Sequence, residues 1–155
     1  MRPDSNQKKL FAKVRTIFED KIPFNSVLGL KIESLDFESA SLKFEMGEQL
    51  VGNYYKGSLH GGVVSAVLDV TGGLVAFLSV IKKMRGKPTQ QTMERFSRLG
   101  TIDLRVDYLR PGLGEHFLAT GYILRIGNRV AVTRMELHNN EERLIAVGTG
   151  AYQVA

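Results

Sequence analysis

The sequence contains no cysteine. Disulfide bonds, thiolate metal sites and a cysteine nucleophile are therefore excluded, and the composition fits a reducing compartment. The first residues lead into a charged amphipathic segment without the apolar stretch of a secretory signal, so we expect a cytoplasmic protein. With 155 residues and an ordinary apolar fraction, the chain is long enough for one domain with a sizeable core.

Several common catalytic and binding motifs are also missing. The three histidines, His60, His116 and His138, lie in separate segments, and no pair has the spacing of metal ligands. Ser58 and Ser65 lie in no Gly-x-Ser-x-Gly motif, and the glycine pairs form neither a P-loop nor a dinucleotide-binding motif. A metal centre and a serine nucleophile are therefore poorly supported.

Positive charge is concentrated in one segment, 82–98, which holds six basic residues and one acidic residue, Glu94. Its surplus equals the formal net charge of the whole chain, +5. Such a segment can attract nucleic acid, anionic lipid or a phosphorylated small ligand, or it can be a solvated loop without a partner. Phe96 is its only aromatic residue, so nucleic-acid binding has no specific support. The basic residues are Lys82, Lys83, Arg85, Lys87, Arg95 and Arg98.

The most apolar stretch runs from Gly61 to Ile81 and contains a single charged residue, Asp69. As a helix, its 21 residues would be about 31 Å long, enough to cross a membrane. Asp69 near the middle, together with four glycines, disfavours membrane insertion. A helix buried on all sides by its own domain explains the same pattern. We therefore predict a core helix over 61–83 and no membrane span.

The rest of the chain predicts one helix and a set of antiparallel strands. Apolar residues at helical spacing over 7–22 indicate an amphipathic helix that ends at Pro23 and packs on its own domain. Alternating apolar residues predict strands, including one over 101–109 with Ile102, Leu104, Val106 and Tyr108 on one face. The Gly-Asn pair at 127–128 predicts a hairpin. The other predicted strands are 28–37, 40–46, 115–126, 131–138 and 144–153, with a loop over 47–59. The pattern predicts an α+β protein, a long antiparallel sheet packed around one buried helix.

The start of the predicted core helix can do chemistry. The free N–H groups and the helix dipole at Gly61 and Gly62 favour developing negative charge, as an oxyanion hole requires. Asp69 could act as a nucleophile or as a base for water. Eight residues of helix rise about 12 Å, so Gly61 and Asp69 of one chain cannot act on the same carbonyl. A shared site would have to form between two subunits. Equally, Asp69 could be a buried structural carboxylate, and the glycines could serve close packing.

Three segments carry a resemblance to a known family. Leu59-His60-Gly61-Gly62, with Asp69 nine positions after the histidine, resembles the signature of hotdog-fold acyl-CoA thioesterases of the phenylacetic-acid-degradation type. The segment 101–112, which contains Tyr108-Leu109-Arg110-Pro111, resembles that family's third strand. The segment 125–129 resembles its β-turn. The resemblance covers roughly residues 25–153.

The resemblance implies a hotdog fold, with an extra helix over 1–24, a thioesterase domain over 25–155, and a basic insertion at about 82–98. It implies dimers with a continuous sheet, which often pair into tetramers, and active sites at subunit interfaces. Asp69 would be the nucleophile or general base, and the Gly61 amide would polarise the thioester carbonyl. His60 would support the helix start, Asn53 would place water or the carbonyl, and Thr101 would orient water. Further substrate-binding candidates are Gly62, Thr71, Arg125 and Arg129.

We therefore expect an enzyme that hydrolyses an acyl-CoA to a free acid and coenzyme A without a metal or a cofactor. Arg125, Arg129 or the segment 82–98 would contact the nucleotide phosphates. The main alternative is a non-catalytic hotdog module that binds acyl-CoA or a fatty acid, or regulates a partner. A basic binder of nucleic acid or membrane surfaces and a hotdog dehydratase remain further alternatives.

Overall fold

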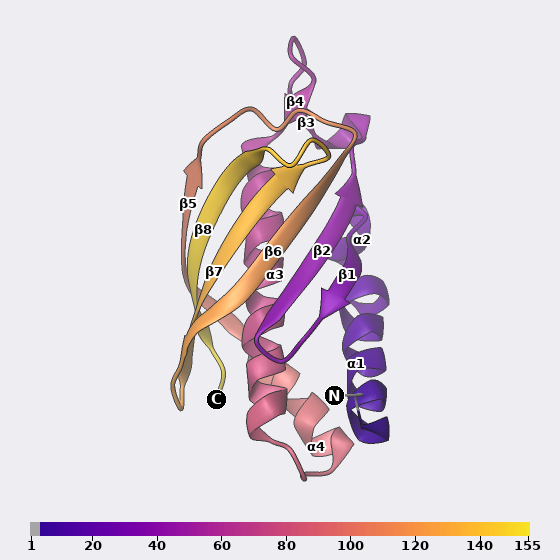
Figure 1. The fold of residues 1–155 in the computed structure, drawn as a ribbon, viewed down its shortest axis with the longest axis vertical. Helices are drawn as coiled ribbons and strands as arrows, with labels where there is room; N and C mark the ends of the chain where they lie inside the picture. The colour runs from indigo at the N-terminus through magenta and orange to yellow at the C-terminus, as the bar shows by residue number, and fades with distance from the viewer. Residues whose placement is uncertain (1–3) are drawn as a thin grey trace.

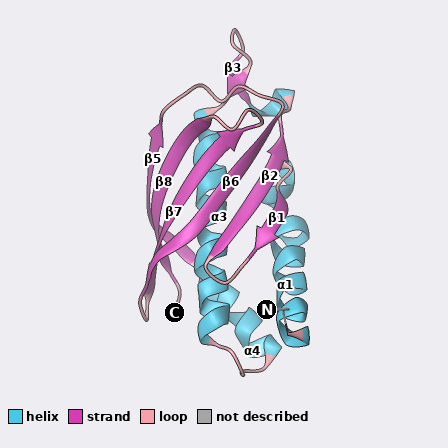
Figure 2. Cartoon of the chain, viewed as in Figure 1, coloured by secondary structure: helices cyan, strands magenta, loops and turns pink. Residues whose placement is uncertain are grey.

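The computed structural model describes residues 4–155, and the three residues before them lie outside the description. The chain forms one long central helix, a large sheet and smaller helices at the N-terminal side (Figures 1 and 2). In chain order the elements are α1 (Ser5–Thr16), the π-helical segment η1 (Ile17–Lys21), α2 (Pro23–Leu28), β1 (Lys31–Leu35), β2 (Ser39–Glu45), the 3-10 turn η2 (Glu48–Leu50), β3 (Val51–Asn53), β4 (Ser58–Leu59), α3 (Gly61–Lys83), α4 (Thr89–Glu94), the 3-10 turn η3 (Arg95–Arg98), β5 (Gly100–Tyr108), β6 (His116–Ile126), β7 (Val130–Asn139) and β8 (Leu144–Gln153).

The large sheet has six antiparallel strands in the order β1-β2-β6-β7-β8-β5. Helix α3 lies against one face of this sheet and contacts its central strands (Figure 1). The prediction of an antiparallel sheet around one core helix is therefore confirmed, and so are the bounds of that helix. The strands at the two ends of the sheet are β1 and β5.

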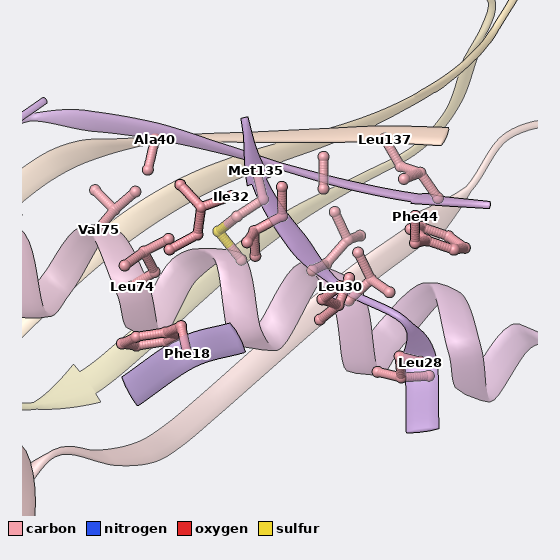
Figure 3. Packing of buried hydrophobic residues seen from close by; sticks show 14 of the residues in the cluster. Phe18, Leu28, Leu30, Ile32, Ala40, Phe44, Leu74, Val75, Met135 and Leu137 are labelled. Carbon is pink, nitrogen blue, oxygen red and sulfur yellow. The ribbon is translucent and has the colours of Figure 1, made fainter. Parts of the chain in front are cut away.

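The core lies between α3 and the sheet (Figure 3). Leu74 and Val75 of α3 are completely buried, and the sheet contributes Phe44 and Met135. The ring of Phe44 stacks on Phe117 of β6, with 5.2 Å between the centroids. Helix α3 is long and apolar enough to cross a membrane by length and composition, but most of that stretch is buried inside the domain. Burial against the sheet therefore accounts for its apolar character.

The N-terminal helices cover the β1 end of the sheet (Figure 1). Arg15 donates to Glu19 Oε1 (2.9 Å) and to the carbonyl of Ile32 (2.7 Å), while the Ile32 N–H donates to the same Glu19 oxygen (2.8 Å). These bonds occupy backbone groups at the edge of β1 that would otherwise be open to pairing. The predicted amphipathic helix is confirmed, and its last turn widens into η1.

The prediction of a strand over 28–37 is wrong at its start. Pro23 ends the first helical run but also begins α2, where it occupies a position that needs no backbone donor. Leu28 belongs to this short helix, and Gly29 ends it with a φ of 70°. Strand β1 begins only at Lys31. The expected boundary between residues 24 and 25 therefore falls within α2.

The basic segment 82–98 is folded onto the domain. It contains α4 and η3. Phe96 packs edge-on against Phe18 (5.7 Å between centroids) and Phe77 of α3 (5.4 Å). Three of its cations are also engaged: Lys82 pairs with Glu38, Lys83 donates to the Gly127 carbonyl, and Arg85 lies over the Phe37 ring. The segment is therefore in part a cover for the core.

Strand β5 contains an irregularity that the alternation pattern did not predict. Its register against β8 shifts between Thr101 and Asp103, so that Ile102 is the extra residue of a bulge. Ile102 is 57% exposed instead of sharing the inner face with Leu104 and Val106. The bulge turns Thr101 towards α3 in its place. The predicted placement of Ile102 is wrong for this reason.

Candidate active site

Helix α3 begins at a loop that His60 holds in place. The short β3–β4 hairpin, within the predicted loop over 47–59, projects beyond the large sheet and leads into α3 (Figure 1). His60 caps the helix, because its Nδ1 accepts the Gly62 N–H (2.8 Å), and its own N–H donates to the Leu50 carbonyl (2.8 Å). Gly52 of β3 lies so close that a Cβ there would be 2.6 Å from the His60 Cα. These contacts fix the direction in which the helix start points.

The Gly61 amide is the open donor at this helix start. Within residues 4–155 its N–H has no hydrogen-bond acceptor, and the residue is exposed. The Gly61 carbonyl accepts a hydrogen bond from the Tyr108 hydroxyl at the end of β5 (3.2 Å). A free N–H at the positive end of a 23-residue helix is suited to an oxyanion. By contrast, the Gly62 N–H is taken by His60 and is not available to a substrate.

Two surface hollows flank Gly61, and Asn53 and Leu59 line both of them. The Asn53 side-chain oxygen accepts the N–H groups of Tyr55 (3.1 Å) and Lys56 (3.3 Å), which shapes the turn of the β3–β4 hairpin. The part of Asn53 that remains for a ligand is therefore its NH₂ group, a donor. The structure brings Asn53, His60 and Gly61 together at one end of α3.

Asp69 lies two turns further along α3, where two hydroxyl groups meet its Oδ1 atom. Thr101 Oγ1 donates to this oxygen from β5 (2.9 Å). The Tyr152 hydroxyl of β8 lies 3.1 Å from the same oxygen and 3.0 Å from the Asp69 backbone carbonyl. The second carboxylate oxygen, Oδ2, makes no hydrogen bond with any residue that the structure describes. Asp69 is partly exposed and thus keeps one oxygen available for chemistry.

Tyr152 is a site residue that the sequence patterns did not reveal. Burial raises the pKa of its phenol strongly, and the negative charge of Asp69 and the hydrogen bond to it raise the pKa further. Tyr152 therefore stays protonated and acts as a donor. Its position was hidden in an ordinary apolar alternation at the end of the last strand, where a tyrosine is a common core residue.

The remaining predicted residues lie elsewhere. Thr71 is fully buried and donates to the Val67 carbonyl within α3 (2.7 Å), so it faces no hollow. Arg125 and Arg129 are exposed at the β6–β7 turn, which Lys83 ties to the C-terminal end of α3. They are thus at the opposite end of this helix from Gly61.

Within one chain the site is divided. Gly61 and Asp69 lie on one continuous helix, whose rise separates them by about 12 Å. Strand β5 links the two halves, with Thr101 bound to Asp69 near one end and Tyr108 bound to Gly61 at the other.

Comparison with known proteins, by sequence and by structure, gives relatives of this chain. The family model of the Thioesterase superfamily matches residues 56–146. The medium/long-chain acyl-CoA thioesterase YigI of Escherichia coli K12 is 47% identical over 141 residues, covering 91% of each chain. A crystal structure of a Shewanella oneidensis protein related to the thioesterase superfamily has a TM-score of 0.93 at 42% identity and covers 99% of this chain and 100% of that one.

A more distantly related structure shares the fold. The PaaI protein from the phenylacetic acid degradation operon of E. coli has a TM-score of 0.75 at 19% identity, covering 96% of this chain and 94% of that one. At that identity the likeness concerns the fold. The family match, the relative at 47% identity and the six-stranded sheet around α3 lead to one conclusion: the chain belongs to the thioesterase superfamily and has the hotdog fold.

Proposed function

We propose that this protein is an acyl-CoA thioesterase that cleaves medium- to long-chain acyl-CoA to the free acid and coenzyme A. The observation that carries the proposal is that one helix, α3, carries both a free N-terminal amide, at Gly61, and a partly exposed carboxylate, at Asp69. The chain length of the substrate is that of YigI, which is named for such substrates.

The chemistry needs one carboxylate and one oxyanion donor. With Asp69 as general base, Oδ2 takes a proton from water and the resulting hydroxide adds to the thioester carbonyl. The Gly61 N–H stabilises the oxyanion, and the tetrahedral intermediate expels the coenzyme A thiolate, which takes up the proton. With Asp69 as nucleophile, Oδ2 attacks the thioester carbonyl and the coenzyme A thiolate leaves, which gives a mixed anhydride on Asp69. Water then cleaves this anhydride to the free acid and the Asp69 carboxylate, and the proton that water loses goes to the thiolate. The Asn53 NH₂ group would donate to the carbonyl or to the water.

Pairing of β5 with its copy in a second subunit would assemble this site. Strand β5 is at the open end of the sheet, whereas the β1 end is covered by Arg15 and Glu19. An antiparallel pair of β5 strands, with the twofold axis at Arg105 and the bulge at Ile102 taken into account, would place residue 101 of one chain opposite residue 108 of the other. Thr101 is bound to Asp69 and Tyr108 to Gly61, so this pairing brings Asp69 of one subunit towards Gly61 of its partner.

The two arginines fit a role at the phosphates of coenzyme A. The β-sheet rung that pairs Thr101 with Tyr152 continues through Ala131 to Ile126, next to Arg125. Arg125 and Arg129 are exposed, and within residues 4–155 neither forms an ion pair. We therefore propose that the phosphates bind at the end of the sheet where Thr101 contacts Asp69.

The test is release of free thiol from short, medium, long and aryl acyl-CoA substrates, measured with the wild type and with Asp69→Ala. We expect turnover of medium- and long-chain substrates and a loss of about 10³-fold or more in kcat for the variant. Asp20→Ala removes an exposed carboxylate of η1 and should keep full activity. Tight binding of acyl-CoA without turnover by the wild type would instead favour the non-catalytic binding module.

A further inference from the structure

We propose that Tyr152 is a positioning residue that holds Asp69 for catalysis, and that the glycines around its ring are present to admit it. This inference rests on the proposed thioesterase function, because it assigns a role next to the same carboxylate. It concerns three features: the hydroxyl on Asp69, the strand register behind it, and the space left by Gly72 and Gly150.

The first feature is the shared acceptor. Tyr152 and Thr101 both reach Asp69 Oδ1, at 3.1 and 2.9 Å. Two donors on one oxygen restrict rotation of the carboxylate group and leave Oδ2 as the atom that can reach water or a thioester. The phenol proton of Tyr152 is directed towards Asp69, because its two acceptors, the backbone carbonyl (3.0 Å) and Oδ1 (3.1 Å), belong to that residue.

The second feature is the register of the sheet. Thr101 of β5 and Tyr152 of β8 are directly paired residues on neighbouring strands. Their side chains share the face that α3 covers only because the bulge at Ile102 turns Thr101 inward. If the alternation of β5 continued regularly from Leu104 back to its start, Thr101 would point away from α3. The bulge and the pairing thus deliver two hydroxyl groups to one carboxylate.

The third feature is the space around the phenol. A Cβ on Gly72 of α3 would collide with the Tyr152 hydroxyl and lie 2.8 Å from Thr133 Oγ1. A Cβ on Gly150 would lie 2.6 Å from the Tyr152 ring. Gly73, next along the helix, differs, because a Cβ there would be 3.6 Å from the ring, an ordinary contact. Glycine at position 72 is therefore required by the hydroxyl end of Tyr152, whose ring carbon Cζ would also lie 2.8 Å from such a Cβ, together with Thr133.

The experiment measures kcat and KM for a medium-chain acyl-CoA with folded, oligomeric wild type, Asp69→Ala and Tyr152→Phe. Removing the hydroxyl keeps the ring and should lower kcat by about tenfold or more, since a hydrogen bond to a charged group is worth that much, with KM within about twofold. Tyr122→Phe, which changes an exposed tyrosine of β6, should leave both constants unchanged.

The neighbouring glycines give a second, matched test that does not alter Tyr152 itself. Gly72→Ala should displace the hydroxyl and reproduce the loss in kcat, whereas Gly73→Ala should keep wild-type kcat. Both changes add the same methyl group to the same helix, so a difference between them reports on the Tyr152 hydroxyl.

The outcomes are distinguishable. An active wild type, an inactive Asp69→Ala and an unchanged kcat in Tyr152→Phe would overturn the positioning role and leave the thioesterase function standing. Equal kcat in Gly72→Ala and Gly73→Ala would overturn it as well. An inactive wild type would overturn the proposed function and this inference together.

Discussion

Mixing two inactive variants tests whether each active site forms between subunits. Asp69→Ala removes the carboxylate from one kind of chain, and Gly61→Val covers the helix N-terminal amide of the other. The atoms nearest to a Cβ on Gly61 belong to Tyr108, with its Cε1 atom at 3.5 Å, so the valine should be accommodated without unfolding. Each variant alone should lose about 10²-fold or more in kcat.

The expected recovery follows from the geometry. Because Gly61 and Asp69 are about 12 Å apart along one helix, the proposed mechanism requires that each site uses Asp69 of one chain and Gly61 of its partner. In a mixed dimer, one site carries both substitutions and the other carries both native residues. Random assembly makes about half of the dimers mixed, with one intact site in two, so the mixture should recover about a quarter of wild-type activity.

The assay is thiol release after co-expression or after unfolding and refolding the two variants together, with a different affinity tag on each chain. The tags allow mixed dimers to be isolated, and these should have about half of the wild-type activity per dimer. The two purified variants, combined without subunit exchange, provide the background. Isolated mixed dimers that remain at this background would refute the shared site and the proposed pairing of β5.

Three further predictions concern stability and the helix start. Phe96→Ala should lower the free energy of unfolding by about 2–4 kcal/mol in thermal or urea denaturation, because it removes two aromatic contacts that hold the segment 82–98. As a control, Phe24→Ala changes an exposed residue and should cost less than about 0.5 kcal/mol. Equal effects of the two substitutions would contradict the role of the segment 82–98 as a cover for the core. His60→Ala should lower the free energy of unfolding by about 1 kcal/mol, because it removes the helix cap, and it should also lower kcat. A loss of stability without any change in kcat would show that the cap does not contribute to catalysis. Above about pH 10 an unfolded tyrosine ionises while Tyr152, whose pKa is raised, stays protonated, so the free energy of unfolding should fall as the pH rises. Tyr152→Phe has no phenol to ionise, so above about pH 10 its deficit in the free energy of unfolding against the wild type should shrink by about 1.4 kcal/mol per pH unit, measured by urea denaturation. A deficit that stays constant with pH would contradict a buried, protonated phenol.

The sequence alone was sufficient for the parts of the fold that follow hydrophobic periodicity. The long apolar run after Gly61 and the regular alternation of the later strands correspond to α3 and to β6, β7 and β8. Leu28 was misassigned because a short apolar run fits a strand or a helix equally well, and Gly29 ends the helix in a way that periodicity does not detect. The order of the segment 82–98 was also beyond the pattern, since it depends on contacts of Phe96 with residues distant in the sequence.

The geometry of the candidate site was predictable where it depends on local sequence, and not where it depends on register. His60, Gly61 and the helix start are consecutive, and Asp69 stands out as the single charge in an apolar helix. Arg125 and Arg129 were included by resemblance, and their role at the phosphates stays a proposal.

Tyr152 shows the limit of reasoning from periodicity. Tyr152 and Asp69 are 83 positions apart, and the packing of β8 on α3 joins them, with room for the phenol left by Gly72. The pairing of β8 with β5 and a bulge one residue long bring Thr101 to the same carboxylate. Each of these is ordinary in isolation: a tyrosine at a strand end, an isoleucine in an alternating run, and a Gly-Gly pair that lowers helix propensity. Only together do they place a second donor on the carboxylate. Gly72, which weakens the helix as a local sequence, is therefore explained by the hydroxyl group that it admits.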